Sequence, residues 1–339
     1  MKQAKIKKQD LTKALDSLRG EYRVIAPVQD NKTVNLKELP AGAAPLLVYT
    51  NFPLSAKWVF FPQSEVICTF KNDEVQDVPV PDARQLVFGI RPCDARSYLM
   101  LDKVFGEFGK GPDPYYMKRR ENGTVVTLSC SEPCATCFCT SIGGHPGGKD
   151  GSDATLFDNG DDVILEAVTA KGEALLDQLS AFSQQPSADE ITHRDRVLQE
   201  AAANMPVVSL DQLKEKLQQS FSDTLWDELS KVCLGCGMCS FECPTCHCFD
   251  ISDEEKGGEG RRIRSWDSCQ FSLFTMHASG HNPRTAKLQR MRQRILHKFL
   301  YTVENFGDVF CVGCGRCISN CPVNQDLREV LTRFAEKEV

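Results

Sequence analysis

Short apolar segments in the first half of the chain predict β-strands. Segments rich in β-branched or aromatic residues lie at 46–50, 65–70, 86–90, 123–129 and 162–167. Residues 94–105 (DARSYLMLDKVF) have a helical pattern instead, with Asp94 as the expected N-cap. Strands combined with such a helix are typical of an α/β domain with a parallel or mixed sheet. We therefore assign residues 1–170 to an α/β domain.

Helical patterns dominate the second half of the chain, residues 171–339. Helices are predicted over residues 171–182 and 211–232. The segment 281–301 contains six Lys or Arg residues and no acid, and its apolar positions predict one buried stripe: Leu288, Met291, Ile295 and Phe299. This half is therefore expected to be α-helical.

Composition and the N-terminus indicate a cytoplasmic protein. The chain of 339 residues has no run of eighteen apolar residues that could span a membrane. Its start, MKQAKIKKQDLTKALDSLRG, lacks the apolar stretch of a signal peptide. Thiols stay reduced in the cytoplasm, so the 17 cysteines are expected to be metal ligands rather than disulfides.

An internal repeat narrows the kind of metal site. The string CLGCGMCSFECP at 233–244 returns as CVGCGRCISNCP at 311–322, with seven of twelve positions identical. Each copy is C-x2-C-x2-C-x3-C-P, the ligand spacing of bacterial [4Fe–4S] clusters. The glycines allow positive φ, so that backbone N–H groups can turn towards the cluster sulfides. Zinc is usually bound by two separated cysteine pairs, and a c-type haem at the CPTCH string (243–247) would require export, so neither reading fits as well.

The fourth cysteine of each run in two-cluster ferredoxins binds the other cluster. By that rule the first cluster would be held by Cys233, Cys236, Cys239 and Cys321, and the second by Cys311, Cys314, Cys317 and Cys243. Cys246 and Cys248 are left over, and we interpret them as structural thiols. The predicted fold is thus an α/β N-terminal domain followed by an α-helical, two-cluster ferredoxin-like domain.

A second group of cysteines lies upstream. Cys130, Cys134, Cys137 and Cys139 directly follow a predicted strand, and Cys93 lies at a strand-to-helix turn, where a helix N-terminus favours a thiolate. These five residues could supply a third cluster. Their spacing is also compatible with a zinc site or with small buried side chains.

The chain resembles the iron–sulfur β subunits of cytoplasmic sulfhydrogenases and the related A subunit of anaerobic sulfite reductase. The resemblance extends from about Leu46 onward and is carried by RPCDARSYLMLDKVF, CSEPCATCFCTSIG, CPTCHCFD, RSWDSCQFSLFTMHASGHNPR, RMRQRILHKFLY and CVGCGRCISNCPV. It implies a third cluster held by Cys93, Cys130, Cys137 and Cys139. Cys134 departs from the family pattern, which leaves that ligand set open. The resemblance also implies that Cys269 packs near the clusters without binding one.

The resemblance further implies an electron-transfer subunit that works between two partners. One partner would be a flavin- and NAD(P)-binding subunit, and the other a terminal reductase or hydrogenase subunit. An alternative is a catalytic iron–sulfur subunit with an open iron site, but both downstream runs have all four cysteines. A nucleic-acid-binding role, suggested by the basic segments 261–264 and 281–301, is disfavoured by the net charge of −6. We expect neither a nucleic-acid partner nor a membrane span.

Overall fold

The computed structural model describes residues 2–72, 74–107, 109 and 111–337, which form two compact units. The first unit contains the described residues up to Ala56 together with Pro81–Pro206 and Val312–Cys314. The second contains Lys57–Val80, Val207–Cys311 and the described residues from Gly315 onward. Each unit is therefore assembled from segments that are far apart in the sequence.

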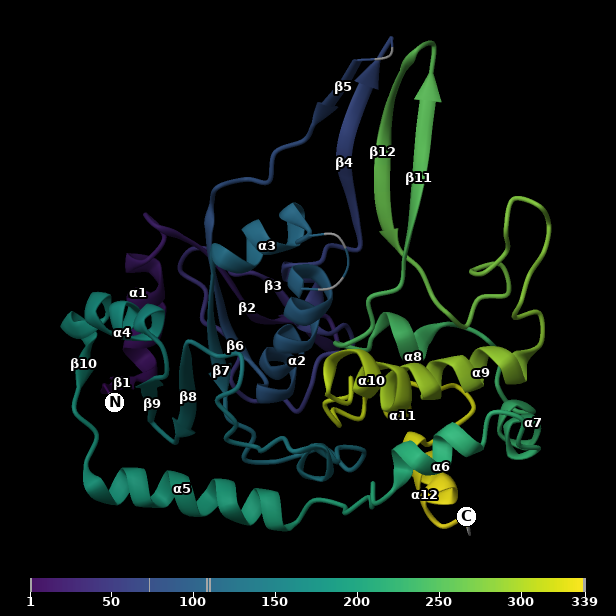
Figure 1. Ribbon diagram of the computed structural model, residues 1–339. Helices are drawn as coiled ribbons and strands as arrows, with labels where there is room; N and C mark the ends of the chain where they lie inside the picture. Colours follow the sequence, from purple (N-terminus) through teal and green to yellow (C-terminus); the bar gives the residue numbers. More distant parts are fainter. Residues whose placement is uncertain (1, 73, 108, 110, 338–339) are drawn as a thin grey trace. The chain divides into compact units, whose positions relative to one another are not determined.

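An eight-stranded mixed sheet forms the centre of the first unit, in the order β10-β1-β9-β8-β7-β6-β2-β3 (Figure 1). The pairs β2–β6, β6–β7 and β7–β8 are parallel, and the remaining pairs are antiparallel. The strands are β1 (Gln3–Lys7), β2 (Tyr22–Asp30), β3 (Thr33–Glu38), β6 (Arg84–Ile90), β7 (Gly123–Leu128), β8 (Ala154–Asn159), β9 (Asp162–Ala167) and β10 (Ser183–Gln184).

Helices cover both faces of this sheet. Successive strand residues point to opposite faces, and Leu86, Phe88, Val126 and Leu128 join the core beneath helices α1 and α4. Leu198 of helix α5 packs on the opposite face with the neighbouring strands β8 and β9. The helices of this unit are α1 (Lys8–Ser17), α2 (Pro92–Asp102), α3 (Pro114–Glu121), α4 (Ala170–Gln178) and α5 (Ala188–Ala203).

Two local predictions for the first unit were wrong. Residues 46–50 are not a strand, although the Leu46 N–H donates to the Pro27 carbonyl at 2.8 Å. Pro27 has no N–H to donate in return, so a ladder cannot continue there. Helix α2 begins at Pro92, with Arg91 at the N-cap, because proline is preorganised for the first helical position. Asp94 lies in the first turn and accepts a hydrogen bond from the Ala56 N–H at 3.3 Å.

The second unit combines short helices with a four-stranded antiparallel sheet, in the order β11-β12-β4-β5 (Figure 1). Its strands are β4 (Ser64–Lys71), β5 (Glu74–Asp77), β11 (Phe249–Lys256) and β12 (Glu259–Trp266). Its helices are α6 (Leu213–Gln219), α7 (Leu225–Ser230), α8 (Met238–Phe241), α9 (Lys287–Leu296), α10 (Thr302–Phe306), α11 (Arg316–Ser319) and α12 (Leu327–Ala335). A search of the described residues for a helix of the length and apolarity needed to cross a membrane finds none.

This sheet contradicts the prediction of an α-helical ferredoxin-like domain. Strand β11, FDISDEEK, is exposed at every residue, so it lacks the apolar alternation by which a strand is recognised. Ion pairs to the adjacent strand hold it instead, with Arg262 Nε 2.7 Å from Asp253 Oδ1 and Arg261 Nη2 2.7 Å from Glu254 Oε2. Cross-strand pairs of opposite charge stabilise a sheet without requiring a buried face.

Candidate metal centres

The two cysteine runs form the same local structure. In each, a loop with two glycines at positive φ leads into a helix of four residues, α8 after Gly237 and α11 after Gly315. Both of these glycines are the residue directly before the helix, with φ values of 77° and 71°. The repeat seen in the sequence is therefore also a repeat of backbone conformation.

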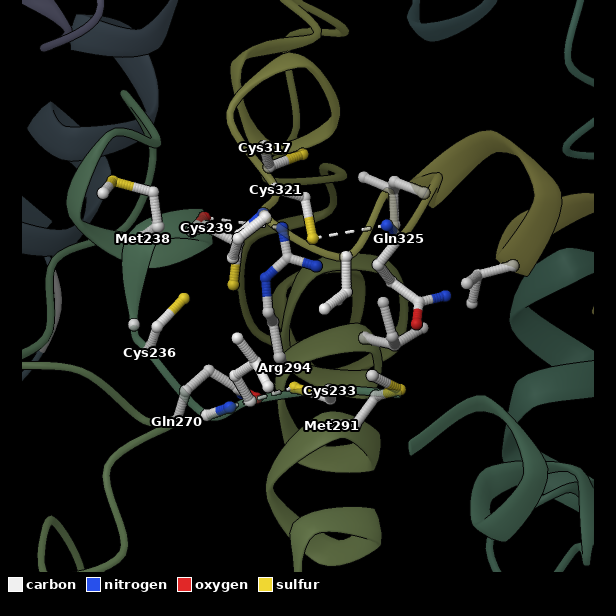
Figure 2. A pocket seen from close by; sticks show the side chains of 18 residues that line it. Cys233, Cys236, Met238, Cys239, Gln270, Met291, Arg294, Cys317, Cys321 and Gln325 are labelled. Atoms are coloured by element: carbon white, nitrogen blue, oxygen red, sulfur yellow. Dashed lines mark hydrogen bonds between the residues drawn. The ribbon is translucent and has the colours of Figure 1, made fainter. Parts of the chain in front are cut away.

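One pocket of the second unit brings cysteines of both runs together (Figure 2). It encloses about 650 Å³ of empty space, part of it open to solvent, and its cysteines are Cys233, Cys236, Cys239, Cys317 and Cys321. Leu234, Met238, Met291 and Ile295 add apolar walls. Three cysteines of the first run thus share a cavity with the fourth cysteine of the second run.

Cys243, the fourth cysteine of the first run, is buried beside a lysine. The Lys298 ammonium donates to Cys243 Sγ at 3.2 Å and is itself only 3% exposed. Burial alone would lower the pKa of Lys298, but the thiolates of Cys243 and Cys246 raise it above its ordinary value. Cys311, another cysteine of the proposed second set, is also buried. A second buried cation, Lys57, donates to the Cys246 carbonyl at 2.9 Å, and burial lowers its pKa to about 8.

The first unit contains a separate pocket lined by Cys93, Cys130, Cys137 and Cys139. Strands β6 and β7 are parallel neighbours, so their carboxyl ends lie at the same edge of the sheet. Cys93 follows β6 and Cys130 follows β7, which explains how residues 37 positions apart come together. Cys314 of the second run lines the same pocket, whereas Cys134 does not.

Arg91 fixes the loops around this pocket. Its Nε donates to the Thr50 carbonyl at 3.0 Å, and its Nη1 donates to the Ser129 carbonyl at 2.8 Å. Its guanidinium also lies over the Tyr49 ring, 4.3 Å from the centroid.

Burial raises the pKa of Cys139 to about 11, so this thiol is neutral until a metal displaces its proton.

A backbone contact joins the second run to this pocket. The Phe138 N–H donates to the Gly313 carbonyl at 2.8 Å, and Cys137 Sγ lies 3.5 Å from the Cys314 carbonyl oxygen. Gly313 has φ +62°, and a Cβ built on it would lie 2.6 Å from Cys139 Cα. Only glycine permits so close an approach of two backbones.

Several other thiols and histidines of the two units have shifted pKa values. Interaction with the neighbouring Cys137 lowers the pKa of Cys134. Cys248 accepts a hydrogen bond from Cys269, which lowers the pKa of Cys248. Burial lowers the pKa of His247 to about 3 and that of His297 to about 4, so both rings are neutral at physiological pH.

Nowhere in the described part of the chain do three or more His, Cys, Asp or Glu side chains form a group suited to a single metal ion. A four-iron cube is bound at its corners, so its ligands are spread farther apart than those of one ion. The fit of the residues present to such a group rests on the donor set, because each of the two pockets is lined by at least four cysteines.

Sequence reasoning did not single out three cations near these cysteines: the buried Lys57 and Lys298 and the half-buried Arg294. The available signal was the basic segment 281–301, in which Arg294 and Lys298 lie three positions after the stripe residues Met291 and Ile295. The stripe is buried as predicted at Met291, Ile295 and Phe299.

Comparisons with known proteins agree with this cysteine geometry. The family model described as "4Fe-4S dicluster domain" matches residues 232–325. The chain is 31% identical to sulfhydrogenase 2 subunit beta of Pyrococcus furiosus over 343 aligned positions, which cover 99% of each chain. The resemblance noted in the sequence is thereby confirmed. The dicluster match covers both repeated runs and supports [4Fe–4S] clusters as the cofactor.

Proposed function

Because the chain belongs to the family of sulfhydrogenase β subunits and carries a 4Fe–4S dicluster domain, we propose that it is an electron-transfer subunit of a cytoplasmic redox complex. It would relay single electrons between a flavin- and NAD(P)-binding subunit and a terminal reductase or hydrogenase subunit. The chain has no nucleotide-binding fingerprint in its sequence, so a partner must supply the two-electron chemistry.

The pocket shared by the two runs carries this proposal. Cys233, Cys236 and Cys239 line it together with Cys321, which supports one ligand set drawn from both runs. Cys243, Cys311, Cys314 and Cys317 remain for a second set. This exchange of the fourth ligand is the arrangement of two-cluster ferredoxins. All ligand positions are then occupied by cysteine, which favours electron transfer over substrate binding at an open iron.

A third set would consist of Cys93, Cys130, Cys137 and Cys139, which line one pocket of the first unit. The same pocket contains Cys314, while Cys317 lines the pocket of the first set. When bound, such clusters accept and release one electron at a time.

The ligand sets are tested by metal analysis of anaerobically purified chain and of two single variants. We expect about twelve irons and as many labile sulfides per chain, corresponding to three cubes. Cys137→Ser should lose about four irons, whereas Cys134→Ser, whose side chain does not line the pocket, should keep the wild-type content. Zinc in place of iron would refute the proposal, and a wild-type iron content in Cys137→Ser would remove the third set.

The proposed electron transfer between two partner subunits is tested by comparing which reductants reduce the clusters. Dithionite should reduce the clusters of the isolated chain, seen as loss of visible absorbance and as EPR signals. NAD(P)H should reduce them only in the native complex that contains a flavin subunit. Reduction of the isolated chain by NAD(P)H would show that it does not depend on such a partner.

A further inference from the structure

Two cations, the half-buried Arg294 and the buried Lys298, lie one helical turn apart beside the proposed clusters of the second unit. Arg294 belongs to helix α9, and Lys298 belongs to the π-helical turn His297–Tyr301 that continues it. Residues four positions apart lie on the same side of a helix. The helix therefore directs two positive charges into the part of the unit where the cysteines of both runs gather.

All three donors of the Lys298 ammonium are used in hydrogen bonds, one of them to Cys243. Its Nζ donates to Cys243 Sγ at 3.2 Å, to Thr245 Oγ1 at 2.7 Å and to the Phe310 carbonyl at 2.7 Å. An ammonium group has three donors and no acceptor, so these three acceptors match the charged form of the side chain. A full positive charge thus lies against a sulfur that is proposed to bind the second cluster.

Arg294 is placed differently, because part of its guanidinium has no acceptor. Figure 2 shows the side chain reaching from α9 towards the cysteines of the shared pocket. Its Nη2 donates to the Cys239 carbonyl at 3.4 Å, while its Nε is buried without a hydrogen-bond partner. Buried donors are nearly always satisfied in folded proteins. A cluster held by Cys233, Cys236, Cys239 and Cys321 would supply thiolate and sulfide acceptors in this pocket.

We propose that Arg294 and Lys298 set the relative reduction potentials of the two clusters, Arg294 acting on the first set and Lys298 on the second. This inference rests on the proposed function. Reduction adds one negative charge to a cluster, and a fixed nearby cation stabilises the more negative form, which raises the potential. Both are positioning residues, which act through the charge and hydrogen bonds they present to the ligands.

The experiment is an EPR-monitored redox titration of the full chain, purified anaerobically with its clusters. Lys298→Met removes the charge and the donors and should shift the midpoint potential of one cluster to a more negative value. Arg294→Gln should shift a different cluster in the same direction. Lys298→Arg, which retains the charge, should shift the potential less than Lys298→Met.

Arg292→Gln is the matched control, because it removes the same charge from the same helix. The Arg292 guanidinium points away from the cysteines, with its Nη1 donating to the Phe221 carbonyl at 2.7 Å and its Cζ 3.7 Å from the Phe221 ring centroid. Its midpoint potentials should equal those of the wild type.

Iron content separates failure of this inference from failure of the proposed function. Loaded clusters whose potentials in Lys298→Met and Arg294→Gln equal those of Arg292→Gln would overturn the inference and leave the proposed function standing. A wild-type chain without clusters would overturn both. If Lys298→Met fails to load, Lys298→Gln and Arg294→Gln decide by the same comparison, and unshifted potentials in both would again refute the assignment.

Discussion

Replacing Gly313 with alanine should displace the loop that carries Cys137 and Cys139, two proposed ligands of the third cluster. Gly313 has φ +62°, and the added Cβ would lie 2.6 Å from both the Cα and the N atom of Cys139. It would also lie 2.7 Å from the Phe138 carbonyl carbon. These are backbone atoms of the loop that carries Cys137 and Cys139, so rotation of a side chain cannot relieve the overlap.

Gly307→Ala is a matched control for the loss of stability expected in Gly313→Ala. Gly307 has φ +75°, and nothing lies within 4 Å of a Cβ built on it. Alanine in a left-handed conformation costs about 1–2 kcal/mol, and this cost applies to both glycines. Only Gly313→Ala adds overpacking of about 1–3 kcal/mol. It also disturbs the 2.8 Å hydrogen bond from the Phe138 N–H to the Gly313 carbonyl.

The assay is thermal unfolding of both anaerobically purified variants, together with iron analysis. Gly313→Ala should unfold at a lower temperature than Gly307→Ala and should contain about four fewer irons. Equal unfolding temperatures and equal iron content would refute the reasoning, because they would show that the loop of Cys137 and Cys139 moves aside without cost.

Three further predictions concern groups away from the clusters. Burial opposes ionisation of Glu166, but hydrogen bonds from Lys149 and Arg194 lower its pKa, so its stabilisation is present above the ordinary pKa of 4.5 and is lost as pH falls through the lower folded-state value. Glu166→Gln should therefore reduce stability in urea by about 1.5–3 kcal/mol at pH 7, with a smaller difference at acidic pH; a loss independent of pH would contradict this. Arg264→Met removes one partner of a buried pair, 2.6 Å from Glu65 Oε1, and should cost about 3–5 kcal/mol in urea unfolding; a loss below about 1 kcal/mol would place this pair with exposed surface pairs. Asp113→Ala removes the side chain that caps α3 and should cost about 1 kcal/mol in the same assay, whereas an unchanged midpoint would show that the cap adds nothing.

The sequence was informative wherever a pattern is local. The strands at 86–90, 123–129 and 162–167 are present, because each is a compact apolar segment within the eight-stranded sheet. The helix predicted over 211–232 is divided into α6 and α7, because Ser220–Thr224 interrupt it and Asp223 caps the second part. Strand β11 escaped detection, since its residues are exposed and mostly polar and its partner is found only by folding.

The sequence by itself contained the main chemical indications: two cysteine runs with the spacing of [4Fe–4S] ligands, an additional group of cysteines and the resemblance to sulfhydrogenase β subunits. Ligand spacing of this kind lies within about a dozen consecutive residues, so it can be recognised without knowledge of the tertiary structure. Only the tertiary structure decided which distant groups meet. It brought Cys321 into a pocket with Cys233, placed Cys93 and Cys130 at the carboxyl ends of two neighbouring parallel strands, and directed the Lys298 ammonium at Cys243. These arrangements depend on strand order and helix packing, which join segments far apart in the chain and therefore leave no periodic signal in it.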